Sequence, residues 1–170
     1  MGSLRFYFSL LAAKTAYRAL QLTRLSAGTS IIGRYVLKLC PDFLKQCNPY
    51  ISTKINVTGT NGKTTTSGLI THLIKESGKS VINNAMGANM LTGVVNAVAV
   101  SLNPCEQTDF SVIESDEAYL AKIYDQFEAD YLIVTNLFRD QLDRYGELAT
   151  TKRLIQEGIN KKRELKLLLN

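Results

Sequence analysis

The amino-acid sequence predicts an α/β fold in which a parallel sheet has helices on both faces. Short apolar runs that are typical of buried strands alternate with longer helix-compatible segments over most of the chain. One run ends in a glycine-containing turn that is followed by lysine and threonine, as in phosphate-binding loops. With 170 residues, the chain has room for one such domain and a smaller region before it.

Residues 1–52 are expected to form a short helical N-terminal region. Residues 4–23 carry apolar side chains at three- and four-residue steps, which predicts a helix with one apolar stripe. Lys14 and Arg18 interrupt this stretch, so it is not expected to span a membrane. Two alternatives remain, because the helix can pack on the rest of the protein or on a partner, or contact a membrane surface. A second helix at 31–39 and a short turn at Pro41 and Asp42 complete this region.

Residues 53–170 are expected to form the sheet domain. The predicted elements are strands at 54–58, 80–83, 110–113, 131–134 and 165–169, with helices at 64–76, 94–102, 117–127 and from Thr150 or Thr151 to about 160. Because strands alternate with helices, the sheet is predicted to be parallel. No helix follows the last strand, so the domain is expected to be incomplete at its C-terminus, as in a fragment or a truncated product.

The phosphate-loop signature is Gly59-Thr60-Asn61-Gly62-Lys63-Thr64, directly after the first strand. Backbone N–H groups of such a loop point at one anion. Lys63 would neutralise the β- and γ-phosphates of a nucleotide, and the Thr64 hydroxyl would reach Mg²⁺. Val57 stands where the common motif has its first glycine. A glycine turn that contains lysine by chance is the alternative, but the flanking strand and helix favour a nucleotide site.

Two polar segments follow predicted strands. Glu114-Ser115-Asp116-Glu117 comes directly after the strand at 110–113. At the carboxyl end of a parallel strand, Glu114 can ligate the Mg²⁺ that bridges nucleotide phosphates, whereas Asp116 is expected only to cap the next helix. The second segment, residues 136–147, is dense in polar side chains after a buried strand and predicts a site loop.

Charge and cysteine content limit the possible partners and compartment. All charged residues before Asp42 are basic, namely Arg5, Lys14, Arg18, Arg24, Arg34 and Lys38. This region either meets an acidic surface such as anionic lipid or forms a solvated basic face. Nucleic acid is not an expected partner, because aromatic and basic residues do not interleave. Cys40, Cys47 and Cys105 lack the spacing of a zinc site and indicate free thiols in a reducing, cytoplasmic environment.

Three motifs together resemble the central domain of the Mur ligases, which are ATP-dependent amide-forming enzymes of peptidoglycan synthesis. They are Thr58-Gly59-Thr60-Asn61-Gly62-Lys63-Thr64-Thr65, Glu114-Ser115-Asp116-Glu117, and Asn136-x-x-x-Asp140-Gln141-x-Asp143-Arg144-Tyr145, and the resemblance covers about residues 53–170. It implies ATP and Mg²⁺ as cofactors, with Thr64 and Glu114 as metal ligands. The implied nucleotide ligands are Gly59, Thr60, Asn61, Gly62, Lys63, Thr64, Thr65 and Asn136. No catalytic residue is assigned.

Most Mur ligases have histidine at the position of Gln141, and that histidine helps to hold a second Mg²⁺. An amide is a weaker Mg²⁺ ligand than a carboxylate, so this second site is left open. The segment around Gln141 and the short N-terminal region resemble one branch of the family, the Mur-ligase-like subunits of lipid II isoglutaminyl synthase.

That resemblance implies ATP-dependent activation of the D-glutamate α-carboxylate in lipid II. Ammonia from a glutamine amidotransferase subunit (GatD-like) would then form the amide. The family's zinc insertion and C-terminal domain would lie beyond Asn170, so this chain alone is expected to be inactive. The alternatives are another Mur-superfamily amide ligase, such as a folylpolyglutamate synthase-like enzyme, or an inactive remnant. The inner face of the membrane is an open alternative location, through contacts of residues 4–23.

Overall fold

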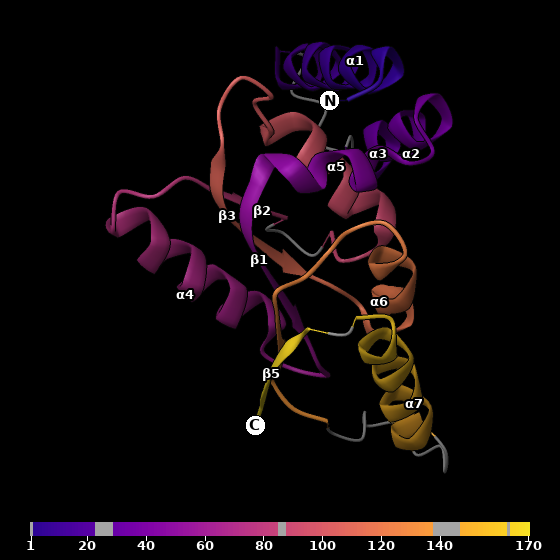
Figure 1. The fold of residues 1–170 in the computed structure, drawn as a ribbon, viewed down its shortest axis with the longest axis vertical. Coiled ribbons are helices and arrows are strands. Elements are labelled where there is room, and N and C mark those ends of the chain that lie inside the picture. The colour runs from indigo at the N-terminus through magenta and orange to yellow at the C-terminus, as the bar shows by residue number, and fades with distance from the viewer. Residues whose placement is uncertain (1, 23–28, 85–87, 138–146, 163) are drawn as a thin grey trace.

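The computed structural model describes residues 2–22, 29–84, 88–137, 147–162 and 164–170. Within these ranges the sheet has the strands β1 (Ile51–Thr58), β2 (Val81–Asn83), β3 (Thr108–Glu114), β4 (Tyr131–Val134) and β5 (Lys166–Leu169). Their order is β2-β3-β1-β4-β5, and every pairing is parallel (Figure 1). The predicted α/β fold with a parallel sheet is therefore confirmed.

The register of β1 decides which residues meet at the carboxyl edge of the sheet. Val57 lies opposite Glu114 of β3, and Thr58 lies opposite Val134 of β4. The segments that follow these three strands therefore start side by side. In an open parallel sheet, this edge is where ligands bind.

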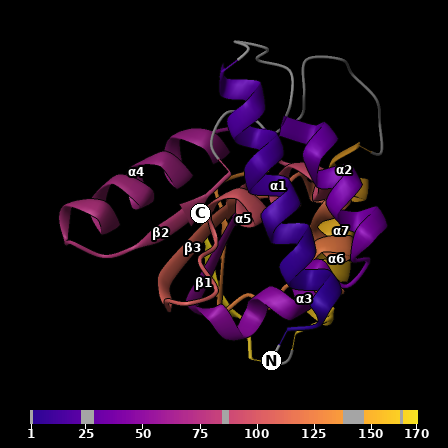
Figure 2. The same ribbon diagram turned by 90° about the horizontal axis from the view of Figure 1, so that it is seen from above.

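Helices cover both faces of the sheet. They are α4 (Lys63–Glu76), α5 (Leu91–Ser101), α6 (Glu117–Tyr124) and α7 (Glu147–Asn160). Figures 1 and 2 show α4 on one face and the pair α6 and α7 on the other. α4 contacts β1, β2 and β3, and α6 packs against α7.

The N-terminal region is helical, with α1 (Leu4–Leu22), α2 (Thr29–Leu39), α3 (Phe43–Cys47) and the 3₁₀ turn η1 (Asn48–Tyr50). Both α1 and α2 pack on α5, and Figure 2 looks down on this layer. Phe6 and Phe43 are fully buried in the same apolar cluster as Val94 and Leu132, so these helices share the core of the sheet domain. The proposed division at residue 52 stays a prediction.

A glycine permits the close approach of α2 to α5. A Cβ atom added to Gly33 would lie 1.8 Å from the backbone oxygen of Thr92, so any larger side chain would push the helices apart. Among the described helices, none is both long enough and apolar enough to cross a membrane.

The predicted elements are all present, with shifts at their ends. β1 begins at Ile51 instead of residue 54, because pairing with β3 already starts at Ile51 and Thr108. α6 ends at Tyr124 instead of residue 127. Phe127 is buried, so it belongs to the apolar pattern although it lies beyond the helix. α7 begins at Glu147, earlier than the predicted caps Thr150 and Thr151.

Candidate nucleotide-binding site

The loop between β1 and α4 contains two glycines with positive φ, Gly59 at 124° and Gly62 at 82°. A Cβ atom on Gly59 would also lie 2.4 Å from Thr135 Oγ1, so glycine is required there for conformation and for space. In this fully described loop, no side chain caps the first turn of α4. The N–H groups at the start of the helix can therefore donate hydrogen bonds to an anion.

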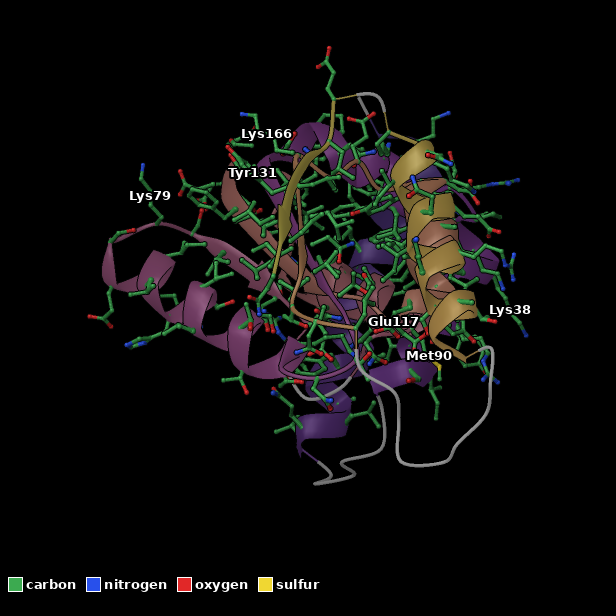
Figure 3. The ribbon with its side chains drawn as sticks, turned by 90° about the horizontal axis from the view of Figure 1, so that it is seen from below. Lys38, Lys79, Met90, Glu117, Tyr131 and Lys166 are labelled. Atoms are coloured by element: carbon green, nitrogen blue, oxygen red, sulfur yellow. The ribbon has the colours of Figure 1, made fainter. Side chains whose placement is uncertain are left out.

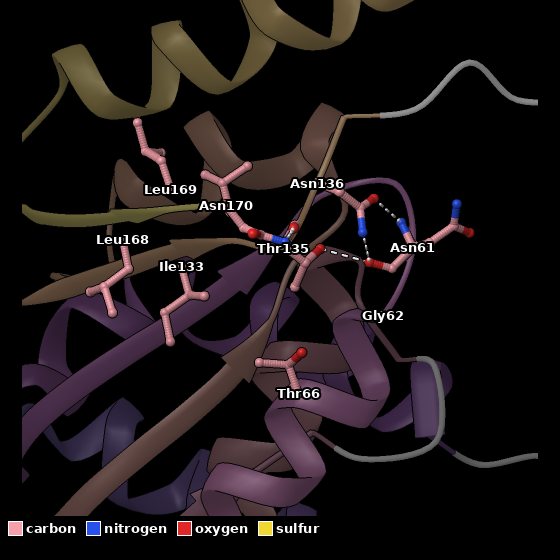
Figure 4. A pocket seen from close by; sticks show the side chains of 10 residues that line it. Asn61, Gly62, Thr66, Ile133, Thr135, Asn136, Leu168, Leu169 and Asn170 are labelled. Carbon is pink, nitrogen blue, oxygen red and sulfur yellow. Dashed lines mark hydrogen bonds between the residues drawn. The ribbon is translucent and has the colours of Figure 1, made fainter.

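The residues that follow β4 hold this loop in place. Asn136 accepts from Asn61 N and donates from Nδ2 to Asn61 O, both at 3.0 Å, while its backbone oxygen accepts from Thr60 N at 3.0 Å. Thr135 Oγ1 donates to Asn61 O at 2.7 Å (Figure 4). Asn136 thus positions the loop, and its predicted role as a nucleotide ligand stays a prediction. Thr135 was missed in the sequence, although a polar residue directly after a buried strand is a usable signal.

Lys63 is the first residue of α4, and its ammonium group folds back over the loop. Nζ donates to the backbone oxygens of Gly59 at 2.5 Å and Thr60 at 3.3 Å. It also lies 3.4 Å from Glu117 Oε1, and the two side chains are only 15% and 16% exposed. The lysine is therefore held near the glycine turn, where the phosphate-loop pattern predicts it.

Glu117 has a position that the sequence did not reveal. Its Oε1 accepts a hydrogen bond from Gly59 N at 3.1 Å in addition to its contact with Lys63. It lies at the end of the sheet where α4 begins (Figure 3). A carboxylate thus contacts both a loop N–H and the loop lysine, the groups that would face a bound anion. The sequence placed Glu117 in an acidic segment without a role.

Thr64 and Glu114 form the candidate metal site. Thr64 Oγ1 donates to Glu114 Oε2 at 2.8 Å, and Asn89 Nδ2 lies 3.4 Å from the other carboxylate oxygen. Glu114 is 3% exposed. Asn84 fixes its backbone twice, since Oδ1 accepts from Glu114 N at 2.7 Å and Nδ2 donates to Glu114 O at 2.8 Å.

The oxygens of Thr64 and Glu114 suit a hard cation such as Mg²⁺. No group of three or more His, Cys, Asp or Glu that could hold a metal occurs in the described part of the chain. The remaining Mg²⁺ ligands would therefore be phosphate oxygens and water, which is usual when Mg²⁺ binds with a nucleotide. The donor set thus fits Mg²⁺ in a nucleotide complex.

A cleft of about 440 Å³ opens beside the loop. Its lining comes from the loop and α4 (Asn61, Gly62 and Thr66), from the end of β4 and from the end of β5 (Figure 4). The ends of β4 and β5 contribute apolar side chains, such as Ile133 and Leu168. The cleft lies at the carboxyl ends of parallel strands, the usual ligand position in open sheets.

Other sequence predictions have mixed outcomes. Asp116 caps α6, with its carboxylate accepting from Ala118 N at 2.9 Å, as predicted. The three cysteines are free thiols, with Cys40 and Cys47 buried and Cys105 exposed. Gln141 lies outside the described residues, so the second metal site stays a prediction.

Comparison with known proteins gives a consistent result. The family model described as the Mur ligase middle domain matches residues 57–169. Subunit MurT of a lipid II isoglutaminyl synthase (glutamine-hydrolyzing) from Streptococcus pneumoniae is 34% identical over 168 residues, which is 99% of this chain and 37% of that protein. The MurT subunit of Staphylococcus aureus (strain COL) is 37% identical over 143 residues, 84% of this chain and 32% of that protein.

The same fold occurs in a solved Mur ligase. The structure of the MurF ligase from Thermotoga maritima in complex with ADP has a TM-score of 0.63 and 20% sequence identity, covering 81% of this chain and 32% of that one. This chain spans about a third of the length of the two curated relatives.

Proposed function

Because this chain belongs to the Mur ligase family, we propose that it is the ATP-binding part of a lipid II isoglutaminyl synthase. The observation that carries the proposal is the pair of Thr64 and Glu114, whose side-chain oxygens lie 2.8 Å apart next to the phosphate loop. The similarity to two MurT subunits of synthases with this name supports the choice within the family.

In this proposal each part of the site has one role. The N–H groups of Gly59 and of residues 62–65 bind the phosphates of ATP, and Lys63 neutralises part of their charge. Thr64 and Glu114 would hold Mg²⁺, which would reduce the negative charge on the phosphates. The cleft lined by Asn136 and the end of β5 receives the nucleoside.

The proposed reaction activates a carboxylate. The α-carboxylate of D-glutamate in the lipid II stem peptide attacks the γ-phosphorus of ATP, giving an acyl phosphate and ADP. Ammonia then attacks the acyl carbon, phosphate leaves, and D-isoglutamine is formed. The ammonia comes from a glutamine amidotransferase subunit, in agreement with the glutamine-hydrolyzing activity in the names of the relatives. We place this reaction in the cytoplasm.

Replacing Lys63 with alanine tests the nucleotide site. Lys63→Ala should weaken Mg·ATP binding at least about tenfold, equal to about 1.4 kcal/mol, because the ammonium group compensates phosphate charge. Isothermal titration calorimetry measures the affinity. Lys75→Ala is the matched control, since Lys75 is an exposed residue of the same helix, near its other end.

Comparing the two variants distinguishes a loss of nucleotide binding from a loss of the folded structure. Both variants should still unfold cooperatively, because neither lysine is part of the apolar core, although Lys63→Ala loses its contacts with the loop and with Glu117. Unchanged ATP affinity in Lys63→Ala would contradict the assignment of the site.

A further inference from the structure

α1 and α2 expose many large apolar side chains on the outside of the molecule. On α1 these are Leu4 (87% exposed), Phe8 (60%), Leu11 (66%) and Leu22 (86%), and on α2 they are Ile31 (53%), Tyr35 (60%) and Leu39 (42%). Leu4, Phe8 and Leu11 follow one another at helical spacing, as do Ile31, Tyr35 and Leu39, so each helix presents a continuous apolar row. Rows of this kind indicate a contact surface.

A groove of about 500 Å³ lies between the two helices. Its α1 side includes Ala12 and Ala16, and its α2 side includes Ile31, Tyr35 and Leu39. All of its lining residues are alanine, leucine, isoleucine, valine or tyrosine. The groove shares Ile31, Tyr35 and Leu39 with the exposed row of α2, and the exposed row of α1 lies on the helix that forms its other side. We call the groove and these two rows the α1–α2 face.

All the charges on these two helices are positive. Arg34 and Lys38 are four residues apart, each next along the helix surface to the row of Ile31, Tyr35 and Leu39. Lys38 Nζ lies 5.6 Å from the centre of the Tyr35 ring. On α1, Lys14 and Arg18 are also four residues apart, beside the row of exposed leucines. No acidic residue occurs before Asp42.

We propose that the α1–α2 face docks on a membrane surface that contains anionic phospholipid. In an interfacial helix, apolar side chains enter the boundary of the acyl chains while Lys and Arg extend to the headgroups, which is the arrangement found here. Because every charged residue of α1 and α2 is positive, an anionic membrane is a better match for this face than a protein partner. A uniformly negative surface complements it, whereas a typical protein surface mixes both signs.

The position of the face in the molecule is compatible with docking. α1 lies at the opposite end of the long axis from β5 and the C-terminus (Figure 1). The cleft of Figure 4, which includes Leu169 and Asn170, is therefore on the far side and stays accessible. Docking does not depend on the proposed ligase function, because vesicle binding requires neither ATP nor a substrate.

Vesicle flotation with the protein expressed from its full gene tests the proposal. The protein should float with vesicles of phosphatidylglycerol and phosphatidylcholine, and at least about fivefold less with phosphatidylcholine alone, because the basic residues need anionic headgroups. Raising NaCl from about 0.1 M to about 0.5 M should weaken binding, since salt screens exposed charges. No binding to the anionic vesicles, or equal binding to both kinds, would overturn the proposal.

Two sets of variants locate the binding face. Leu11→Glu combined with Tyr35→Glu should abolish flotation by placing charge in the apolar rows. Arg18→Glu combined with Arg34→Glu should reduce flotation severalfold. Because these two residues are exposed, this second double variant still tests the proposal if the first double variant does not fold. Leu73→Glu on α4 is the matched control, because Leu73 is 59% exposed and lies outside the face. Circular dichroism melting checks the fold, and folded variants of the α1–α2 face that float like the original protein would contradict the proposal.

Discussion

The carboxylate of Glu117 occupies the loop that is expected to bind phosphate. Its Oε1 accepts from Gly59 N and lies near Lys63 Nζ, at 3.1 Å and 3.4 Å. A triphosphate would have to replace both contacts, and its negative charge would repel the carboxylate. At the scale of single residues, Glu117 therefore competes with the proposed ligand.

This competition gives a testable expectation. Glu117→Gln should tighten Mg·ATP binding severalfold, because the amide keeps the size of the side chain and removes its charge. Calorimetric titration measures the change, with Glu76→Gln, an exposed residue at the end of α4, as the control. Equal or weaker binding in Glu117→Gln would show that the carboxylate does not compete.

Substitution of Gly59 is expected to lower the free energy of unfolding. Gly59→Ala combines an unfavourable φ of 124° with a Cβ contact of 2.4 Å to Thr135 Oγ1. Gly78→Ala has only the positive φ, 75°, with no atom within 4 Å of the added Cβ. Chemical denaturation should therefore give a loss of about 1–2 kcal/mol for Gly78→Ala and a larger loss for Gly59→Ala. Equal losses would mean that Thr135 gives way without cost.

Single residues also show what the sequence could predict about the site. The phosphate loop, Glu114 and the Asp116 cap follow from local patterns, since each depends on the element that directly precedes or follows it. The contacts of Glu117 and Thr135 with the loop join segments that are 58 and 74 residues apart along the chain. Such contacts depend on how β1, β3 and β4 align, which a local pattern does not contain.

At the scale of elements, the contact between α2 and α5 depends on Gly33. Gly33→Ala should lower the free energy of unfolding by about 1–3 kcal/mol, because its Cβ would meet the Thr92 backbone oxygen at 1.8 Å and separate the helices. Denaturant unfolding monitored by circular dichroism measures this loss.

Gly68→Ala in α4 is the matched control for the helix contact. An added Cβ there has no neighbour within 4 Å, so alanine should stabilise the helix by about 0.5–1 kcal/mol. The two substitutions are therefore expected to have opposite signs. A stabilising effect of Gly33→Ala would contradict the close contact between α2 and α5.

The type of each element was predictable because apolar spacing differs between strands and helices. The residues at which each element begins and ends were less predictable. The sequence 51–53 carries no clear strand pattern, yet Ile51 pairs with Thr108 and extends β1. Phe127 is apolar and buried, so the pattern extended α6 too far. Tertiary pairing and burial thus decided the ends that local periodicity left open.

At the scale of the whole molecule, activity is expected to need more than these 170 residues. If the chain has the proposed function, glutamine-dependent amidation of lipid II should appear only when the portion that the longer relatives have in addition and an amidotransferase subunit are both supplied. The reason is that this chain spans 37% of the MurT subunit of Streptococcus pneumoniae. Mass spectrometry of the lipid product measures amidation, and omission of glutamine is the control. Amidation by this chain alone would contradict the expectation.

The two hydrogen bonds between Asn84 and the backbone of Glu114 have a consequence for binding free energy. They fix the backbone of Glu114, and the hydrogen bonds from Thr64 and Asn89 hold its carboxylate, so much of the conformational entropy of Glu114 is lost before any ligand arrives. Ordering a side chain at the moment of binding costs roughly 0.5–1.5 kcal/mol, which subtracts from affinity. A carboxylate that is already immobilised avoids this loss, so a cation at Thr64 and Glu114 would bind a preorganised site.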